Sequence, residues 1–266
     1  MGSGQTADKS GLNRPPRTER KADRVADHLL RQIVAGEVAV GSLLPKEAEL
    51  AAEHRVNRSV VREAIKLLEV HRLVRPVKRR GTVVLDPVAS FSPEVLQAMM
   101  VPSPGQVQPD RLRDFLEIRE SLDVQMSVLA ATRRTDADLE ALDAHVPVLR
   151  DALGDRDRYN READAFSRSV ARAAHNRIFE MLVWWNQEVA TELQYIFDAV
   201  RPANEPHLMG VQLLIQLIRA KDSDAIGSLV TTFHQWASPR VMAAAALSSG
   251  AALEELGIVD KERTRR

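Results

Sequence analysis

The stretch from Leu44 to Leu85 constrains the fold of this chain more than any other part of it. A short helical pattern opens at Pro45, and a second helical pattern runs over residues 58–71 after a turn at 54–56. Two β-prone runs then flank a glycine-containing loop, which is typical of a β-hairpin. Two helices, a tight turn and a hairpin are the parts of a winged helix-turn-helix, in which the second helix enters the major groove of DNA.

Polar side chains gather at the start of that second helix. Asn57 is a good N-cap, and Arg58 and Arg62 share the exposed face because they are four residues apart, with Ser59 beside them. An arginine can bond guanine O6 and N7 together, and such a contact gives ~1–3 kcal/mol of base discrimination. Arginines near a helix N-terminus oppose the helix dipole unless an anion compensates. The pattern therefore favours a recognition helix over an ordinary solvated face.

The predicted hairpin carries three consecutive cations at its tip, Lys78, Arg79 and Arg80, followed by Gly81. Glycine at a hairpin tip supplies the positive φ that a tight turn needs. A lone run of charge is usually a solvated loop. Directly after a helix-turn-helix, the same run suits a phosphate backbone or a minor groove, and we interpret it as a wing.

The net charge of zero hides an asymmetry along the chain. Residues 1–85 hold 17 Lys+Arg and 10 Asp+Glu, whereas residues 86–266 hold 20 and 27, so that +7 and −7 cancel. A basic first third and an acidic remainder suggest one DNA-facing domain and one that avoids DNA. The chain has no cysteine, which excludes disulfides and thiolate chemistry. With no signal-peptide pattern and no apolar run near the ~20 residues of a membrane span, we expect a cytoplasmic protein without a membrane partner.

The remaining chain divides by composition and periodicity. We expect a disordered arm over 1–19, the winged helix-turn-helix over 20–86 and a proline-rich linker over 87–109. Apolar residues at helical spacing and short loops predict an antiparallel all-α bundle over 110–246, followed by a tail over 247–266. The predicted fold class is therefore mainly α, with about six bundle helices, at 111–131, 136–152, 156–174, 176–200, 206–220 and 223–246.

One combination of residues in the first part is specific. Its members are Ile33, Gly36-Glu37, Gly41, Leu44-Pro45, Glu47, Glu49-Leu50-Ala51, Val56-Asn57-Arg58, Val61-Arg62-Glu63-Ala64, Leu67, Leu73-Val74 and Arg79-Arg80-Gly81-Thr82-Val83-Val84. With these residues the segment 20–85 resembles the DNA-binding domain of the GntR superfamily of bacterial transcription regulators. The resemblance implies DNA contacts at the four polar residues that open the recognition helix, and at Arg80 and Gly81 in the wing. The family often has an arginine where this chain has Ala48, and Lys46 is the candidate to replace it.

The segments 115–123, 164–168, 174–176 and the last helix pair resemble the FCD ligand-binding domain, which follows the winged helix in the FadR-like branch of that superfamily. The resemblance implies a homodimer on a palindromic DNA operator and a small-molecule effector, a carboxylate or an acyl-CoA type, in a pocket of the bundle. Arg119 either binds an anionic effector group or pairs with Asp123 or Glu120. The candidate effector residues are Arg119, Asp123, Ser167, His207 and His234.

Many FCD domains hold a metal through one acid and three histidines. In this chain Ser167 and Val211 stand where the resemblance places two of those histidines, and His207 lies one turn before Val211. We therefore predict no metal ligands and no required cofactor, with a divalent metal such as zinc as the alternative. Family members without a metal bind effectors directly, so the sensor role does not depend on it.

Taken together, these patterns predict a ligand-responsive transcriptional repressor that a small acidic metabolite releases or retunes. The alternative from another class is a helical metal-dependent hydrolase with a fused DNA-binding-like module. That alternative needs an assembled catalytic set, and the chain has no cysteine, no Gly-x-Ser-x-Gly elbow, no glycine-rich phosphate loop and no His-Glu-x-x-His. We therefore predict no catalytic residues and a protein that is not an enzyme.

Overall fold

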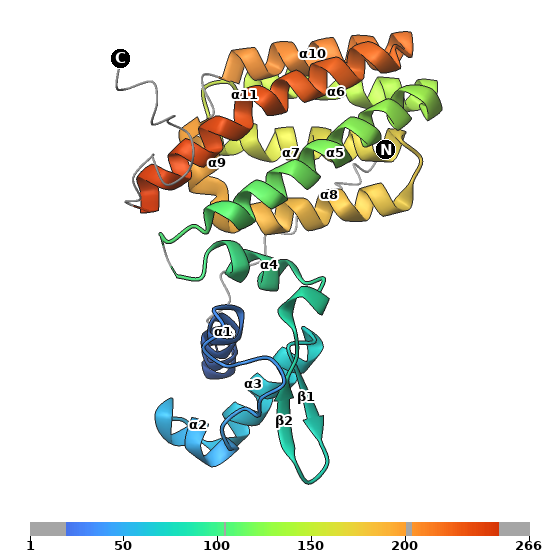
Figure 1. The fold of residues 1–266 in the computed structure, drawn as a ribbon. Coiled ribbons are helices and arrows are strands. Elements are labelled where there is room, and N and C mark those ends of the chain that lie inside the picture. The colour runs from blue at the N-terminus through green and yellow to red at the C-terminus, as the bar shows by residue number, and fades with distance from the viewer. Residues whose placement is uncertain (1–19, 104, 201–203, 250–266) are drawn as a thin grey trace, which may run out of the picture. The chain divides into compact units, whose positions relative to one another are not determined.

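The computed structural model describes residues 20–103, 105–200 and 204–249 (Figure 1). The chain forms two compact units, the first ending at Ala89 and the second beginning at Ser90. Helices dominate both units, and β1 and β2 form the two-stranded sheet of the described chain, so the predicted mainly α fold class is confirmed. The predicted arm at 1–19 and the tail beyond Ser249 lie outside the described residues.

The first unit is a winged helix-turn-helix. Its elements are α1 (Lys21–Val34), α2 (Glu47–Glu53), α3 (Arg58–Val70), β1 (Val74–Val77) and β2 (Gly81–Val84). Apolar residues at helical spacing on α1 and α3 meet in its core, where Leu29, Val61 and Leu68 are buried. The start of α2 differs from the prediction, because its N-cap is Lys46 and Pro45 therefore precedes the helix.

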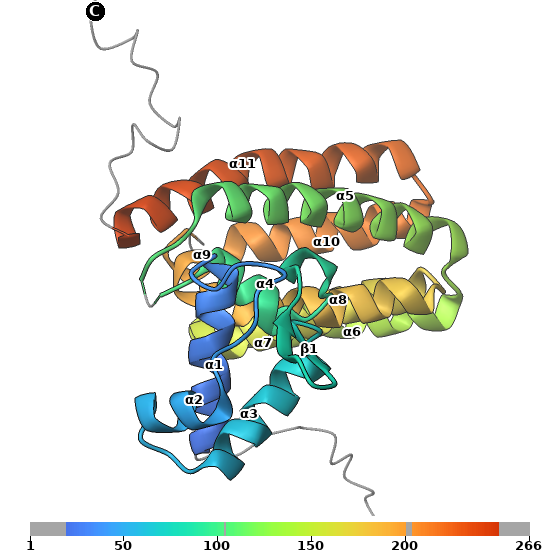
Figure 2. The same cartoon turned by 60° about the horizontal axis from the view of Figure 1, so that its bottom comes forward.

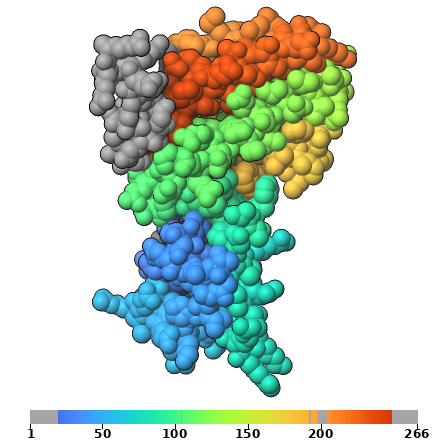
Figure 3. Space-filling view, viewed as in Figure 1, coloured from blue at the N-terminus to red at the C-terminus, as the bar shows by residue number. Residues whose placement is uncertain are grey.

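The wing is an antiparallel hairpin in which Val74 pairs with Val84 and Val77 pairs with Gly81. A third segment joins its edge, since the Leu44 N–H donates to the Thr82 carbonyl at 2.8 Å and the Val84 N–H donates to the Ser42 carbonyl at 2.9 Å. The connector between α1 and α2 is thus hydrogen-bonded to the wing. The hairpin tip projects from the surface of the first unit (Figure 3).

Residues 87–109, predicted as a linker, divide between the two units. The turn η1 (Pro87–Ala89) ends the first unit, whereas α4 (Pro93–Met100) packs against helices of the second. Met100, Val101 and Val107 are buried in the core of that second unit. The proline content predicted the break between elements, but the burial of these apolar residues depends on the helices that cover them.

The second unit is a bundle of long helices. It contains α5 (Pro109–Arg133), α6 (Asp136–Asp151), α7 (Arg156–Ala173), α8 (Arg177–Ala190), η2 (Thr191–Leu193), α9 (Gln194–Val200), α10 (Asn204–Ala220) and α11 (Ser223–Ser249). The helices α5 and α11 run side by side along one face (Figures 1 and 2). Two apolar clusters fill the interior, one around Leu142, Tyr159 and Ile215 and the other around Leu112 and Leu193.

The prediction of a single helix over 176–200 was wrong. The chain bends at the 3₁₀ turn η2, so that α8 and α9 are separate helices. Leu193 at the end of η2 and Ile196 in α9 are fully buried, and the Thr191 hydroxyl donates to the Gln187 carbonyl at 3.1 Å. Threonine hydroxyls that bond back to the preceding turn commonly bend a helix, and the buried side chains hold the bend in place.

Candidate DNA-binding surface and helical-domain cavity

The start of α3 is capped as the sequence predicted. The Asn57 Oδ1 accepts hydrogen bonds from the Val60 N–H at 3.0 Å and from the Ser59 Oγ at 2.8 Å. This arrangement satisfies one free N–H of the first turn and fixes the direction in which α3 begins. Arg58 is exposed at the first position of the helix and has no ion-pair partner among the described residues.

Arg62, the second predicted arginine, already has an anionic partner. Its Nε donates to the Glu47 Oε2 of α2 at 2.7 Å, and the two side chains are 65% and 38% exposed. Exposed ion pairs contribute ~0–1 kcal/mol, so a DNA phosphate or base can displace Glu47 at low cost. An arginine near a helix N-terminus is unfavourable unless an anion lies close to it, and Glu47 is such an anion for Arg62. The position of Arg62 near the start of α3 is therefore not by itself a sign of DNA contact.

The predicted cations of α2 and the wing are exposed. Lys46, Lys78, Arg79 and Arg80 all lie at the surface of the first unit. The left-handed residue at the hairpin tip is Arg79, with φ 64°, whereas Gly81 has φ 118° and begins β2. The placement of Gly81 at the tip was therefore wrong, although a positive φ at Gly81 is observed.

A further cation belongs to this surface although the sequence reasoning did not select it. Arg55 lies in the turn between α2 and α3, is exposed, and has φ 53°. The sequence signal that could have found it is its position two residues before the Asn57 cap. A basic residue in the turn of a helix-turn-helix lies close to the end of the helix that enters the groove.

The second unit contains a cavity of about 400 Å³ between α5, α7, α9, α10 and α11. All five predicted effector residues line it: Arg119, Asp123, Ser167, His207 and His234. Aromatic and aliphatic side chains form the rest of the wall, among them Phe166, Phe197, Phe233, Trp236 and Leu214. An apolar cavity with a few convergent polar groups is the usual form of a small-molecule site.

A hydrogen-bonded pair from α5 and α11 forms the polar part of the cavity. The His234 Nε2 lies 3.0 Å from the Asp123 Oδ2, and His234 is 5% exposed. The Arg119 Nε lies 3.8 Å from the same carboxylate oxygen, and its guanidinium lies 5.3 Å from the centre of the Phe197 ring. The ion pair between Arg119 and Asp123 therefore forms, but its length is beyond a hydrogen bond and leaves Arg119 able to donate to another anion.

His207 and Ser167 are held by neighbouring groups at the cavity wall. The His207 Nδ1 lies 2.9 Å from the hydroxyl of the buried Tyr159, which itself donates to the Asn204 carbonyl at 3.1 Å. Because that hydroxyl proton is used, Nδ1 is the donor to the Tyr159 oxygen in this network. The Ser167 Oγ donates to the Ala163 carbonyl one turn earlier at 3.2 Å.

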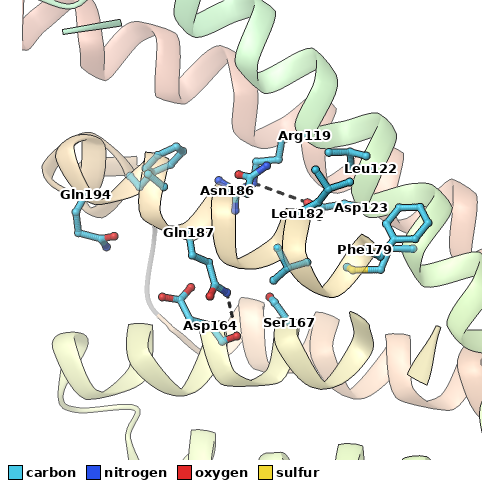
Figure 4. Close-up of a pocket in the computed structure, with 14 residues that line it drawn as sticks. Arg119, Leu122, Asp123, Asp164, Ser167, Phe179, Leu182, Asn186, Gln187 and Gln194 are labelled. Carbon is cyan, nitrogen blue, oxygen red and sulfur yellow. Dashed lines mark hydrogen bonds and ion pairs between the residues drawn. The ribbon is translucent and has the colours of Figure 1, made fainter. Parts of the chain in front are cut away.

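A smaller recess of about 90 Å³ lies on the α8 side of the same polar residues (Figure 4). Arg119, Asp123 and Ser167 line both spaces, while α8 adds the amides of Asn186 and Gln187. The Gln187 Nε2 donates to the Asp164 carbonyl at 3.0 Å. Sequence reasoning missed the two amides, because no motif marks them and only the packing of α8 on α7 brings them to the site.

The residues of this cavity do not fit the metal set that the resemblance describes. Asp123 and His234 are present, but Ser167 and the buried Val211 occupy two of the histidine positions and supply no imidazole. Within the described part of the helical domain, no three His, Asp or Glu ligand atoms lie within 4.8 Å of one another.

Two pKa shifts in the bundle have clear causes. Burial lowers the pKa of His145, assisted by Arg172 and Arg168 and opposed by Glu162. Burial alone would raise the pKa of Asp138, but hydrogen bonds from the Thr135 backbone and hydroxyl and from His175 outweigh it and hold that pKa below its ordinary value. Both groups lie outside the cavity lining, so they bear on stability rather than on ligand binding.

A recognition-helix surface on one unit and a ligand-sized cavity in another define a DNA-binding transcription regulator as the class of protein. The family described as bacterial regulatory proteins, gntR family, matches residues 21–84, and the FCD domain family matches residues 114–234. The chain therefore combines a gntR-family DNA-binding domain with an FCD domain, and it is a transcription regulator rather than an enzyme.

Known regulators resemble the chain over most of its length. An uncharacterized HTH-type transcriptional regulator of Mycobacterium tuberculosis is 28% identical over 226 residues, which cover 85% of this chain and 91% of the relative. The galactonate operon transcriptional repressor of Escherichia coli is 28% identical over 214 residues, covering 78% and 91%. The HTH-type transcriptional repressor NanR of Cronobacter sakazakii is 29% identical over 169 residues, covering 63% and 64%.

One solved structure shows the same fold. The Listeria monocytogenes regulator Lar matches with a TM-score of 0.54 at 19% identity, over 85% of this chain and 96% of that one. In the described ranges, no helix is both long enough and apolar enough to cross a membrane.

Proposed function

We propose that this regulator belongs to the FadR-like branch and binds a palindromic operator as a homodimer. A small acidic metabolite that binds in the helical domain releases the regulator from DNA or changes its affinity for DNA. The observation that carries the proposal is the 400 Å³ cavity, which Arg119 and the Asp123–His234 pair line together with aromatic side chains. A cytoplasmic location follows from a DNA partner and is part of the proposal. The hydrolase alternative has no support, because both matched families are those of transcription regulators.

The DNA partner is supported by the exposed polar groups of the first unit. Arg58 and Ser59 lie at the start of α3, and Arg79 and Arg80 lie in the wing. In a winged helix-turn-helix, the first turn of the recognition helix meets base edges while the wing contacts the backbone or minor groove. A homodimer would present two such surfaces, and its two-fold symmetry would match a palindrome.

The cavity supports an organic acid as the effector. Arg119 offers N–H donors to a carboxylate, while the aromatic wall suits the apolar part of a ligand. A volume of about 400 Å³ lies near the lower end of the range for ligand sites. This size favours a small acid over an acyl-CoA, whose nucleotide part would need room outside the cavity.

The direction of regulation is proposed from the relatives. Two of the regulators similar to this chain are named repressors. For an effector to release DNA, it must bind the DNA-free arrangement of the protein more tightly than the DNA-bound one, since a ligand with equal affinity for both shifts nothing.

Fluorescence anisotropy of the full chain on DNA from upstream of its own gene tests the DNA half of the proposal. Arg58→Ala should weaken binding by ~1–3 kcal/mol if Arg58 contacts a base, and should lower the salt dependence if it contacts a phosphate. Lys66→Ala, which removes an exposed cation from the later part of α3, is the control. Binding that Arg58→Ala leaves unchanged at every salt concentration would remove Arg58 from the interface.

A thermal-shift screen of small organic acids tests the effector half. A ligand at 100 times its dissociation constant should stabilise the protein by ~2.7 kcal/mol, and Arg119→Ala should abolish that gain for a carboxylate. The active acid should then weaken DNA binding in the anisotropy assay. A ligand that stabilises the protein but leaves the DNA affinity unchanged would refute the proposed coupling.

A further inference from the structure

Three potential metal ligands converge in the first unit, far from the FCD cavity in sequence. They are His28 on α1, Glu53 at the last position of α2 and His54 at the C-cap of that helix. One ligand atom from each residue lies within 4.8 Å of the other two. The two imidazole rings meet edge to face, with centroids 5.0 Å apart and an interplanar angle of 77°.

One nitrogen of this histidine pair has no hydrogen-bond partner in the described part of the chain. The His54 Nε2 is buried, and no group among the described residues forms a hydrogen bond with it. Buried polar atoms in native proteins nearly always have a partner, and an orphaned one calls for an explanation. A neutral imidazole nitrogen that lacks a proton is a good ligand for a transition metal.

The charge at this position also favours a cation. Glu53 occupies the C-terminal end of α2, where the helix dipole is negative, and α2 has no basic residue in its last turn. Among the described residues, the Glu53 carboxylate has no ion-pair partner. A bound cation would offset both the carboxylate charge and the helix end.

We propose that His28, Glu53 and His54 bind a divalent transition metal of the zinc class. Two imidazoles and one carboxylate are a ligand set that zinc accepts, with a fourth position open to water, whereas calcium and magnesium prefer oxygen ligands alone. Zinc bonds of ~2.0–2.2 Å require the three ligand atoms to draw closer, and the exposed side chains of His28 and Glu53 are able to rotate.

The position of this site gives it a structural consequence. The metal would join α1 to the end of α2, immediately before Arg55, whose φ is 53°, and the Asn57 cap of the recognition helix. Bound zinc therefore stabilises the turn that precedes α3. This inference does not rest on the proposed effector site, because it concerns the DNA-binding unit alone.

Isothermal titration of the metal-free full chain with zinc chloride tests the proposal. The wild type should bind one zinc ion at this site, and His28→Ala and Glu53→Gln should each weaken binding by more than about tenfold, since even groups outside a coordination sphere contribute that much to metal affinity. Both side chains are exposed, so neither substitution endangers the fold. His54→Ala extends the series, with its melting temperature in EDTA as the check on folding.

Two control variants separate this site from other histidines. His175→Ala removes an exposed histidine of the second unit, and His234→Gln alters the FCD cavity. Both should keep wild-type zinc affinity. Zinc binding that survives His28→Ala and Glu53→Gln unchanged overturns the proposal, as does zinc binding that only His234→Gln abolishes. These titrations contain no DNA and no effector, so their result is independent of the proposed regulatory function.

Discussion

The Nε of Arg62 in α3 donates to the Oε2 of Glu47 in α2 across 2.7 Å. This ion pair joins the two helices of the helix-turn-helix, and it uses the guanidinium that the sequence assigns to DNA. If Arg62 contacts DNA as proposed, Glu47 and a DNA anion compete for one side chain. The outcome of that competition can be measured, because either partner can be changed alone.

Removal of Glu47 should increase DNA affinity. Glu47→Gln frees the Arg62 guanidinium at a cost in stability of ~0–1 kcal/mol, the usual contribution of an exposed pair. Arg62→Ala should have the opposite effect on binding, with a loss of ~1–3 kcal/mol if the arginine contacts a base. Anisotropy titration against operator DNA measures both changes.

The matched control for charge is Glu63→Gln, which removes an exposed carboxylate next to Arg62 on the same helix. If Glu63→Gln raises DNA affinity as much as Glu47→Gln does, the gain comes from net charge and not from release of Arg62.

A side chain at Gly81 should destabilise the wing. Gly81 has φ 118°, and a Cβ there would meet the Leu43 side chain at an ordinary 3.6 Å, so the cost lies in the backbone and not in a steric clash. Gly81→Ala should lower the stability of the hairpin by ~1–3 kcal/mol. Hydrogen exchange of the β1 and β2 amides is the appropriate measurement. Gly154→Ala, at a glycine with open space and no positive φ, should leave those amides unaffected.

Loss of the Asp123 carboxylate should destabilise the helical domain. Asp123→Ala leaves the buried His234 without its partner at 3.0 Å, and an unsatisfied buried group costs ~1–3 kcal/mol. Asp123→Asn keeps an acceptor oxygen and should cost less. Urea unfolding of the full chain measures both.

Asp110→Ala, at an 87% exposed carboxylate on the same helix, should change stability by less than ~1 kcal/mol. An Asp123→Ala variant as stable as Asp110→Ala would show that the pair with His234 contributes nothing.

Stability should decrease as the pH falls through the titration of His145. Burial lowers the pKa of His145 in the folded protein, and its Nε2 lies 2.8 Å from the Ser169 Oγ. The unfolded chain then binds a proton at the ordinary value of ~6.5 while the folded chain does not, so stability is complete above that pH. It is lost as the pH falls below ~6.5 toward the lowered pKa of the folded state. Melting temperatures at a series of pH values should show this fall in the wild type and a smaller one in His145→Gln. An unchanged pH dependence in the variant would assign the fall to other groups.

Local periodicity was enough to predict most elements of the two units. The observed α3, α6 and α7 begin and end within one or two residues of their predicted limits, because apolar spacing and caps such as Asn57 and Thr135 act within one turn of chain. The bend at Thr191 was not predictable in this way. It depends on burial of Leu193 and Ile196 against helices that are distant in sequence.

The sequence by itself determined the order of elements, the polar residues at the start of α3 and, through resemblance, five residues of the cavity. Only the tertiary structure showed that Arg62 is paired with Glu47, that Asn186 and Gln187 adjoin the cavity, and that His28 approaches His54. Periodicity specifies which face of a helix is buried, but the convergence of side chains from different helices depends on how those helices pack. That packing is a property of the whole core and is not encoded in any single segment.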